Sequence, residues 1–154
     1  MQIVFIINPI AGSKKKKTEI IDLINKHFID QEILYTQKSG DATIFSEEAV
    51  RKKKDIVVAV GGDGTVNECA KALNNTKIPL GIIPCGSGNG FATSLAYTYP
   101  GPSVMSKSLF ALIKKSSVKN RTVPLIKAEF NQQVRYSCLY IASGIIADTD
   151  ILGY

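Results

Sequence analysis

Three short glycine-containing segments hold the residues that could do chemistry. They are NPIAGS (8–13), GGDGT (61–65) and PCGSGNG (84–90), and each follows a run of apolar residues. Glycine allows positive φ angles and has no Cβ atom, so successive N–H groups can approach phosphate oxygens. A helix that follows such a turn adds a partial positive charge. One such segment could be a tight strand-to-helix turn, but several on neighbouring strands favour a phosphate-binding site.

The middle segment also holds a carboxylate, Asp63. Thr65 and Glu68 have the T-x-x-E spacing of a capping box, so we expect Thr65 to cap the next helix and Glu68 to reach back to it. Asp63 is then not needed as a cap. A carboxylate beside phosphates would be repelled unless it accepts a proton from an attacking hydroxyl or holds magnesium. We therefore predict a catalytic Asp63, with a satisfied turn residue as the alternative.

The sequence around these segments predicts an α/β fold. Short β-branched runs alternate with amphipathic stretches, which is typical of parallel strands covered by crossover helices. We expect strands at 2–8, 32–36, 55–60 and 79–84, and helices at 18–28, 41–54, 66–75 and 90–97, with Asp41 as an N-cap. The result is an open, mostly parallel sheet with helices on both faces. Ligands bind at the carboxyl ends of such strands, so the three glycine segments should converge.

The character of the chain changes after YPGP (99–102). A helix is expected at 103–115, and the runs 122–130 and 133–143, separated by Asn131-Gln132, predict an antiparallel hairpin. A lone hairpin is marginally stable, so a β-rich second domain should begin near residue 118 and be cut short. We divide the chain into domains at 1–116 and 117–154.

Composition narrows the class of protein further. The 154 residues suit one core with an appendage, and the three cysteines show no metal-binding or disulfide spacing. No metal held by protein ligands alone is therefore predicted. No apolar run approaches the roughly 20 residues of a membrane span, and no basic leader follows Met1. We expect a cytoplasmic location.

The formal net charge of +6 favours anionic partners. Two runs carry much of it, KKKK at 14–17 and RKKK at 51–54. They are either solvated helix ends or an electrostatic surface for a nucleotide or a membrane. No aromatic residues are interleaved with the lysines, so nucleic acid is not an expected partner.

Two common nucleotide-binding motifs are absent. The chain has no G-x-x-x-x-G-K-[ST] segment. G-x-G-x-x-G also fails, because Phe91 stands where the third glycine would follow Gly86 and Gly88. A P-loop is excluded, and an ordinary dinucleotide-binding Rossmann domain is disfavoured.

Together, NPIAG, GGDGTVNE and PCGSGNGFATSLA resemble the catalytic domain of the diacylglycerol kinase and sphingosine kinase family, which is related more distantly to NAD kinases and 6-phosphofructokinases. The resemblance covers essentially the whole chain. It implies that residues 1–116 are the nucleotide-binding kinase domain, and that 117–154 begin a truncated lipid-binding domain.

The resemblance implies ATP-dependent transfer of the γ-phosphate to a lipid hydroxyl, with Asp63 as the base and Mg²⁺ arriving with ATP. Asn8 and Thr36 would lie by the nucleotide. The residues implied to line its phosphates are Gly61, Gly62, Gly64, Thr65, Gly86, Ser87, Gly88 and Asn89.

The terminal GIIADTD is similar to a segment of sphingosine kinases. The resemblance implies that Asp150, with Asp148 beside it, contacts the amine of a sphingoid base, although both could equally be turn residues. Diacylglycerol therefore stays open as a substrate. Family members also have more of the lipid-binding domain, so we expect this length of chain to bind ATP weakly and to turn over slowly or not at all.

Two other functions stay open: an NAD kinase on the same architecture, and a non-catalytic module that binds phosphates or acidic membranes. The expected partners are a lipid substrate and, peripherally, an anionic membrane. The unpaired edges of the hairpin make a homodimer a further expectation.

Overall fold

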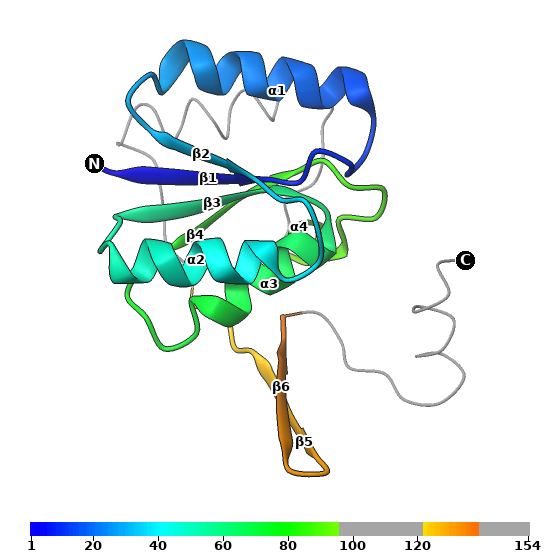
Figure 1. Ribbon diagram of the computed structural model, residues 1–154. Helices are drawn as coiled ribbons and strands as arrows, with labels where there is room; N and C mark the ends of the chain where they lie inside the picture. Colours follow the sequence, from blue (N-terminus) through cyan, green and yellow to red (C-terminus); the bar gives the residue numbers. More distant parts are fainter. Residues whose placement is uncertain (96–121, 139–154) are drawn as a thin grey trace.

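The computed structural model of the chain describes residues 1–95 and 122–138. A four-stranded sheet lies between helix α1 on one side and helices α2 and α3 on the other (Figure 1). A two-stranded hairpin follows. The elements in chain order are β1 (Ile3–Ile7), α1 (Lys14–His27), β2 (Glu32–Tyr35), α2 (Asp41–Arg51), β3 (Ile56–Gly61), α3 (Asp63–Ala72), β4 (Leu80–Pro84), α4 (Gly90–Ser94), β5 (Ile126–Phe130) and β6 (Gln133–Ser137).

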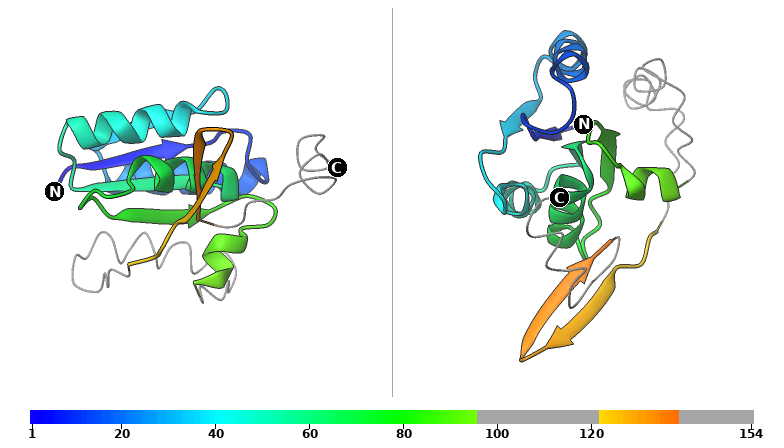
Figure 2. Two further views of the ribbon diagram at one scale, coloured as in Figure 1. Left: turned by 90° about the horizontal axis from the view of Figure 1, so that it is seen from below. Right: turned by 90° about the vertical axis from the view of Figure 1, so that its right-hand side faces the viewer.

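The sheet is parallel throughout, in the order β2-β1-β3-β4. From β1 the chain moves outward to β2, and it then returns to the other side of β1 to form β3. The strand order thus reverses between β1 and β3, and α1 and α3 leave these two strands toward opposite faces of the sheet (Figure 2). Such a switch point is where open α/β sheets bind their ligands.

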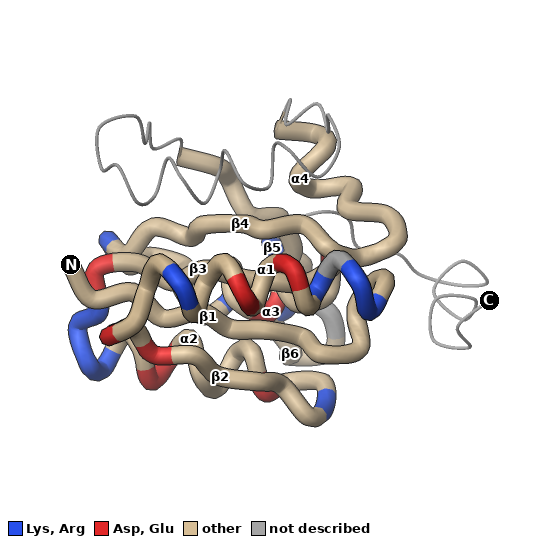
Figure 3. The backbone as a smooth tube through the Cα atoms, turned by 90° about the horizontal axis from the view of Figure 1, so that it is seen from above, with Lys and Arg blue, Asp and Glu red and all other residues tan. Residues whose placement is uncertain are grey.

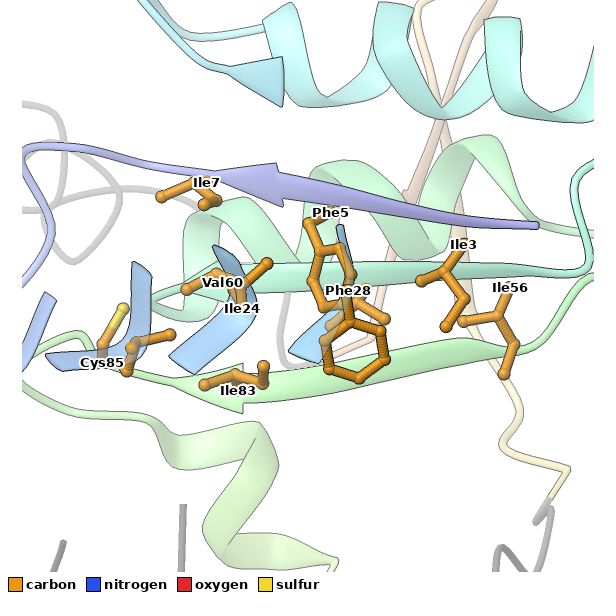
Figure 4. Close-up of a cluster of buried hydrophobic side chains, with 11 residues drawn as sticks. Ile3, Phe5, Ile7, Ile24, Phe28, Ile56, Val60, Ile83 and Cys85 are labelled. Carbon is orange, nitrogen blue, oxygen red and sulfur yellow. The ribbon is translucent and has the colours of Figure 1, made fainter. Parts of the chain in front are cut away.

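Every residue of β1 and β3 is buried, as expected for central strands covered on both faces. On one face Ile20 and Ile24 of α1, together with Phe28 just after the helix, pack against the sheet. Figure 4 shows Ile24 and Phe28 in this cluster. The rings of Phe5 and Phe28 meet edge to face with centroids 5.0 Å apart.

The opposite face of the sheet is covered by α2 and α3. Both helices contribute small or medium side chains, among them Ala42, Ala49, Val66 and Cys69. Phe91 of α4 joins the same cluster. The backbone of the strands is therefore fixed from both sides, which holds their carboxyl ends in a defined arrangement.

The hairpin projects away from the sheet on the α3 side (Figures 1 and 2). Its turn residues Asn131 and Gln132 have φ angles of 47° and 62°, as a two-residue type I′ turn requires. Phe130 pairs with Gln133 beside that turn. Where β6 ends, the N–H of Cys138 donates to Oδ1 of Asn67, 2.9 Å away, so α3 holds the end of the hairpin.

The predicted fold class is confirmed: a parallel sheet with helices on both faces, followed by an antiparallel hairpin. None of the three cysteines is in a disulfide bond. The expected helix 103–115, the continuation of the second hairpin strand to 143 and the division at 116/117 lie outside the described residues, so the domain division stays a prediction. No helix within residues 1–95 and 122–138 is long and apolar enough to cross a membrane.

The N-cap predicted for α2 is wrong. Asp41 is the first residue of the helix, and Gly40 precedes it with a φ of 93° and no side-chain cap. Oδ2 of Asp41 instead accepts the N–H groups of Gln37 (2.8 Å) and Lys38 (3.0 Å). These hydrogen bonds, the Gln37 one most, hold the pKa of the Asp41 carboxyl below its usual value.

Candidate functional site

The three glycine segments lie at the carboxyl ends of adjacent strands. Segment 8–13 follows β1, segment 61–65 follows β3 and segment 84–90 follows β4, and these strands are neighbours in the sheet. Thr36, at the end of β2, donates its N–H to the carbonyl oxygen of Ile7 (2.9 Å) and is buried. The three segments therefore lie together at the carboxyl edge of the sheet, as expected.

Two glycines are required by contacts between these segments. A Cβ atom on Gly12, whose φ is +64°, would lie 1.6 Å from the carbonyl oxygen of Cys85. A Cβ atom on Gly86 would lie 2.5 Å from Cα of Gly62. No side chain fits at either position without a backbone shift, because real Cβ contacts do not approach this closely. The first and second segments thus both pack directly against the third.

Asn8 joins the first and second segments. Its Nδ2 donates to Oγ1 of Thr65 at 3.3 Å, and its Oδ1 accepts the N–H of Ile10 at 3.0 Å. Its own N–H donates to the carbonyl oxygen of Val60, continuing the ladder between β1 and β3. Thr65 is buried. The hydrogen bonds of Asn8, including the one to Thr65, therefore hold the first and second glycine segments in a fixed arrangement.

Asp63 occupies the first position of α3, and its carboxylate reaches the third segment. Oδ2 accepts the N–H of Gly90 at 2.9 Å, and Oδ1 accepts the N–H of Phe91 at 3.0 Å. Asp63 does not cap its own helix, as expected, but its carboxylate satisfies the first two N–H groups of α4. Each carboxylate oxygen keeps a second lone pair, and the residue is only half-buried, so the group can still accept another proton donor.

The third segment is closed by Asn89. Its Oδ1 accepts the N–H of Gly86 at 2.9 Å, and its Nδ2 donates to the carbonyl oxygen of Gly86 at 2.8 Å. Asn89 lies in the left-handed region with a φ of 55°. Ser87 and Gly88 between them are exposed, as is Gly64 in the second segment. Among the candidate phosphate-binding residues, these three are therefore the most accessible to a ligand.

Glu68 does not form the expected capping box. Its Oε1 accepts the N–H of Gly40 (2.9 Å) and the hydroxyl of Ser39 (3.2 Å), and its Oε2 accepts the N–H of Ala42 (3.2 Å). α3 begins at Asp63, three residues earlier than predicted, with Gly62 at its N-cap. The T-x-x-E spacing therefore predicted the wrong hydrogen-bond partner for Glu68. Glycine at position 40, just before α2, has no side chain to cap that helix, and this residue type could have indicated that a carboxylate from another segment caps it.

The end of the hairpin lies close to Asp63. Burial is the main reason that the pKa of the Cys138 thiol is raised to about 11, and the negative charge of Asp63 contributes to the rise. Asn67, which accepts the Cys138 N–H, is the anchor that sequence analysis missed. The predicted substrate residues Asp148 and Asp150 lie outside the described residues.

A magnesium site built from protein ligands alone is not present among the described residues, in which no group of three His, Cys, Asp or Glu side chains could hold a metal ion. The hard oxygen donor at the glycine segments is the carboxylate of Asp63. This donor set fits an ion that is bound mostly by phosphate oxygens and water.

The chain matches the family model described as "Diacylglycerol kinase catalytic domain" over residues 2–123. It is 33% identical over 133 residues to a Klebsiella pneumoniae protein named "Probable lipid kinase YegS-like", which covers 85% of this chain and 42% of that protein. A Staphylococcus carnosus protein named "Diacylglycerol kinase" is 33% identical over 119 residues, covering 74% of this chain and 38% of its own length.

Solved structures are similar over the same region. A crystal structure of a diacylglycerol kinase from Bacillus anthracis str. Sterne aligns with a TM-score of 0.63 and 32% identity, covering 86% of this chain and 47% of the other. The chain thus spans less than half the length of these relatives.

Proposed function

The chain belongs to the diacylglycerol kinase catalytic domain family, and from that premise we propose that it is the nucleotide-binding part of an ATP-dependent lipid kinase. The reaction is transfer of the γ-phosphate of ATP to a lipid hydroxyl. The observation that carries this proposal is the packing of two glycine segments against the third, with Asp63 bonded to the backbone of that third segment.

The phosphates of ATP would bind at the exposed amides of this edge. Gly64, Ser87 and Gly88 are exposed, and nothing lies within 4 Å of a Cβ atom placed on Gly64. Amides oriented in advance stabilise the charge of a transferring phosphoryl group without reorganisation. Asn8, Thr65 and Asn89 act indirectly, because their side chains hold the three segments in place.

Asp63 is the proposed acceptor of the hydroxyl proton. Its two amide hydrogen bonds fix the orientation of the carboxylate, and the remaining lone pairs are free to meet an incoming alcohol. Most of the acceleration in phosphoryl transfer comes from positioning and from charge stabilisation. Mg²⁺ bound with ATP would neutralise phosphate charge, and Asp63 is the described carboxylate placed to assist in holding it.

A transfer assay with γ-labelled ATP tests the proposed substrate class. The full chain, extended by its natural continuation where there is one, is offered diacylglycerol, a sphingoid base and NAD under identical conditions. We expect label in one of the two lipids and none in NAD. Transfer of the label to NAD, with none in either lipid, would instead identify an NAD kinase. If ATP binds but the label reaches none of the three acceptors, the kinase proposal is contradicted.

A further inference from the structure

Asn67 lies one helical turn after Asp63 on α3. Residues four apart on a helix are neighbours on its surface, so the two side chains share one face of α3. Asp63 bonds to the third glycine segment, and Asn67 bonds to the hairpin, because its Oδ1 accepts the Cys138 N–H at 2.9 Å. One face of α3 therefore joins the glycine segments to the end of β6.

The end of β6 is packed against α3 as well as hydrogen-bonded to it (Figure 1). Ser137, its last residue, is buried. Cys138 packs against the buried cluster that contains Phe91, as does Val123. Burial is the main reason that the pKa of the Cys138 thiol is raised to about 11, so this thiol is uncharged at neutral pH. The hairpin end therefore places an uncharged, mostly apolar surface on α3.

The carboxylate of Asp63 lies between two uncharged parts of the chain. Residues 78–95, which include β4 and α4, contain no charged side chain, and Figure 3 shows them as an unbroken tan tube. Asp63 bonds to the Gly90 and Phe91 N–H groups of this stretch. Its charge also acts on the thiol of Cys138, so the end of β6 is close to it. A hydroxyl that gives its proton to Asp63 is therefore next to the end of β6.

We propose that Asn67 is a positioning residue for the phosphate acceptor, because it holds the end of β6 beside Asp63 and so favours a lipid hydroxyl over water. This inference rests on the proposed function and adds to it the choice of acceptor. An apolar surface beside the carboxylate disfavours water and suits the hydrocarbon next to a lipid hydroxyl.

Two reactions of ATP compete in this proposal. In transfer, the acceptor oxygen forms a bond to the γ-phosphorus, and the bond from that phosphorus to the bridging oxygen breaks. ADP leaves with the electron pair, and the hydroxyl proton passes to Asp63. Water in place of the lipid hydroxyl balances the same steps and gives ADP and free phosphate. The ratio of hydrolysis to transfer therefore measures how well the acceptor is positioned.

Three substitutions separate the anchor from the helix that carries it. Asn67→Ala removes the acceptor of the Cys138 N–H, and α3 should keep its structure because alanine favours helix more than asparagine does. Asn67→Asp keeps an oxygen at the same position and should restore the hydrogen bond. Asn74→Ala is the matched control, since Asn74 lies just past the end of α3, is part-buried like Asn67 and leaves that bond in place.

Steady-state transfer from γ-labelled ATP tests the acceptor role. The chain, extended by its natural continuation where there is one, is offered diacylglycerol or a sphingoid base in detergent micelles, whichever the wild type phosphorylates. Asn67→Ala should raise both the KM for lipid and the ratio of hydrolysis to transfer about 10-fold, because one hydrogen bond no longer holds the hairpin end. Its Kd for ATP should change by less than about threefold, and Asn74→Ala should match the wild type.

Equal KM values and equal ratios in Asn67→Ala and Asn74→Ala would overturn the proposal. A loss of ATP affinity in Asn67→Ala as large as its loss of transfer would overturn it too, since Asn67 would then support the nucleotide side. A wild type that binds ATP but transfers phosphate to neither lipid is a different result, because it contradicts the proposed function itself.

Alkylation of Cys138 by iodoacetamide, followed by mass spectrometry of the peptides, tests the anchor without any turnover. Cys69 and Cys85 are buried, so the part-buried Cys138 is the thiol that reports on the hairpin end. Asn67→Ala should react about 5–20-fold faster than the wild type, and Asn67→Asp should stay within about twofold of it. Equal rates in the wild type and Asn67→Ala, or fast labelling of Asn67→Asp, would overturn the proposal even if lipid transfer by the wild type is intact.

Discussion

At the level of single residues, Asp63 combines two tasks that the sequence presents as alternatives. Its carboxylate caps α4 through Gly90 and Phe91, and it faces the glycine segments from the start of α3. A carboxylate that is already hydrogen-bonded to two amides keeps a fixed orientation and loses little side-chain entropy when a substrate arrives. The structural role therefore supports the proposed catalytic one.

Gly86 tests the packing between the segments. Gly86→Ala places a Cβ atom 2.5 Å from Cα of Gly62, so backbone must move, and we expect a loss of about 1–3 kcal/mol in the free energy of unfolding. Gly64→Ala is the matched control, because nothing lies within 4 Å of its Cβ position and it stands inside α3. That variant should be neutral or slightly more stable. Urea denaturation measures both, and equal stabilities would contradict the close approach.

The sequence predicts which residues gather at this edge better than it predicts their partners. Glycine and asparagine at Gly12, Gly86 and Asn89 indicate special backbone requirements by their residue type alone. Their contacts run between segments far apart in the chain, such as the bond from Asn8 to Thr65. Spacing along one segment contains no information about such a partner, and for this reason the capping box expected at Glu68 was wrong.

Between elements, Glu68 links α2 to α3. Its carboxylate satisfies two free N–H groups at the start of α2, which has glycine at its N-cap and no cap of its own. It thereby holds the turn after β2, and with it Thr36, at a fixed distance from the glycine segments.

Replacing Glu68 should separate these helices. Glu68→Ala leaves the Gly40 and Ala42 N–H groups without their acceptor, and we expect a loss of about 1–2 kcal/mol in the free energy of unfolding. Glu47→Ala removes an exposed carboxylate from α2, the helix whose first N–H groups Glu68 accepts, and should change stability by less than about 0.5 kcal/mol. Thermal or urea unfolding of the two variants decides, and a Glu68 variant as stable as the Glu47 variant would disprove the link.

The bounds of helices and strands are also predicted best where the local sequence decides them and less well where contacts between distant segments do. The central strands β1 and β3 are predicted within about one residue, because continuous β-branched runs are typical of strands buried on both faces. Helix starts are less accurate: α3 begins at Asp63 instead of residue 66, and α1 begins at Lys14 instead of residue 18. The glycines near the start of α3 have low helix propensity, and the lysine run at the start of α1 has no apolar periodicity, although lysine itself favours helix.

For the whole molecule, the strand order explains why the site lies where it does. The reversal between β1 and β3 sends α1 and α3 to opposite faces and leaves the first and second glycine segments side by side. The hairpin end joins this edge through Asn67 and Cys138, which places the end of β6 near Asp63. The alternating pattern of the sequence predicts this architecture, whereas the Asn67 anchor depends on packing between distant segments.

The proton-accepting role of Asp63 can be measured by comparing Asp63→Asn with Asp22→Asn in the chain that is used for the transfer assay, extended by its natural continuation where there is one. Asp22 is exposed on α1 and belongs to none of the three glycine segments, so its variant should transfer phosphate to lipid like the wild type. We expect Asp63→Asn to lower kcat by about 10²–10⁴-fold while its Kd for ATP changes by less than about threefold. Turnover by Asp63→Asn equal to that of Asp22→Asn, with ATP still bound, would contradict the proposed mechanism.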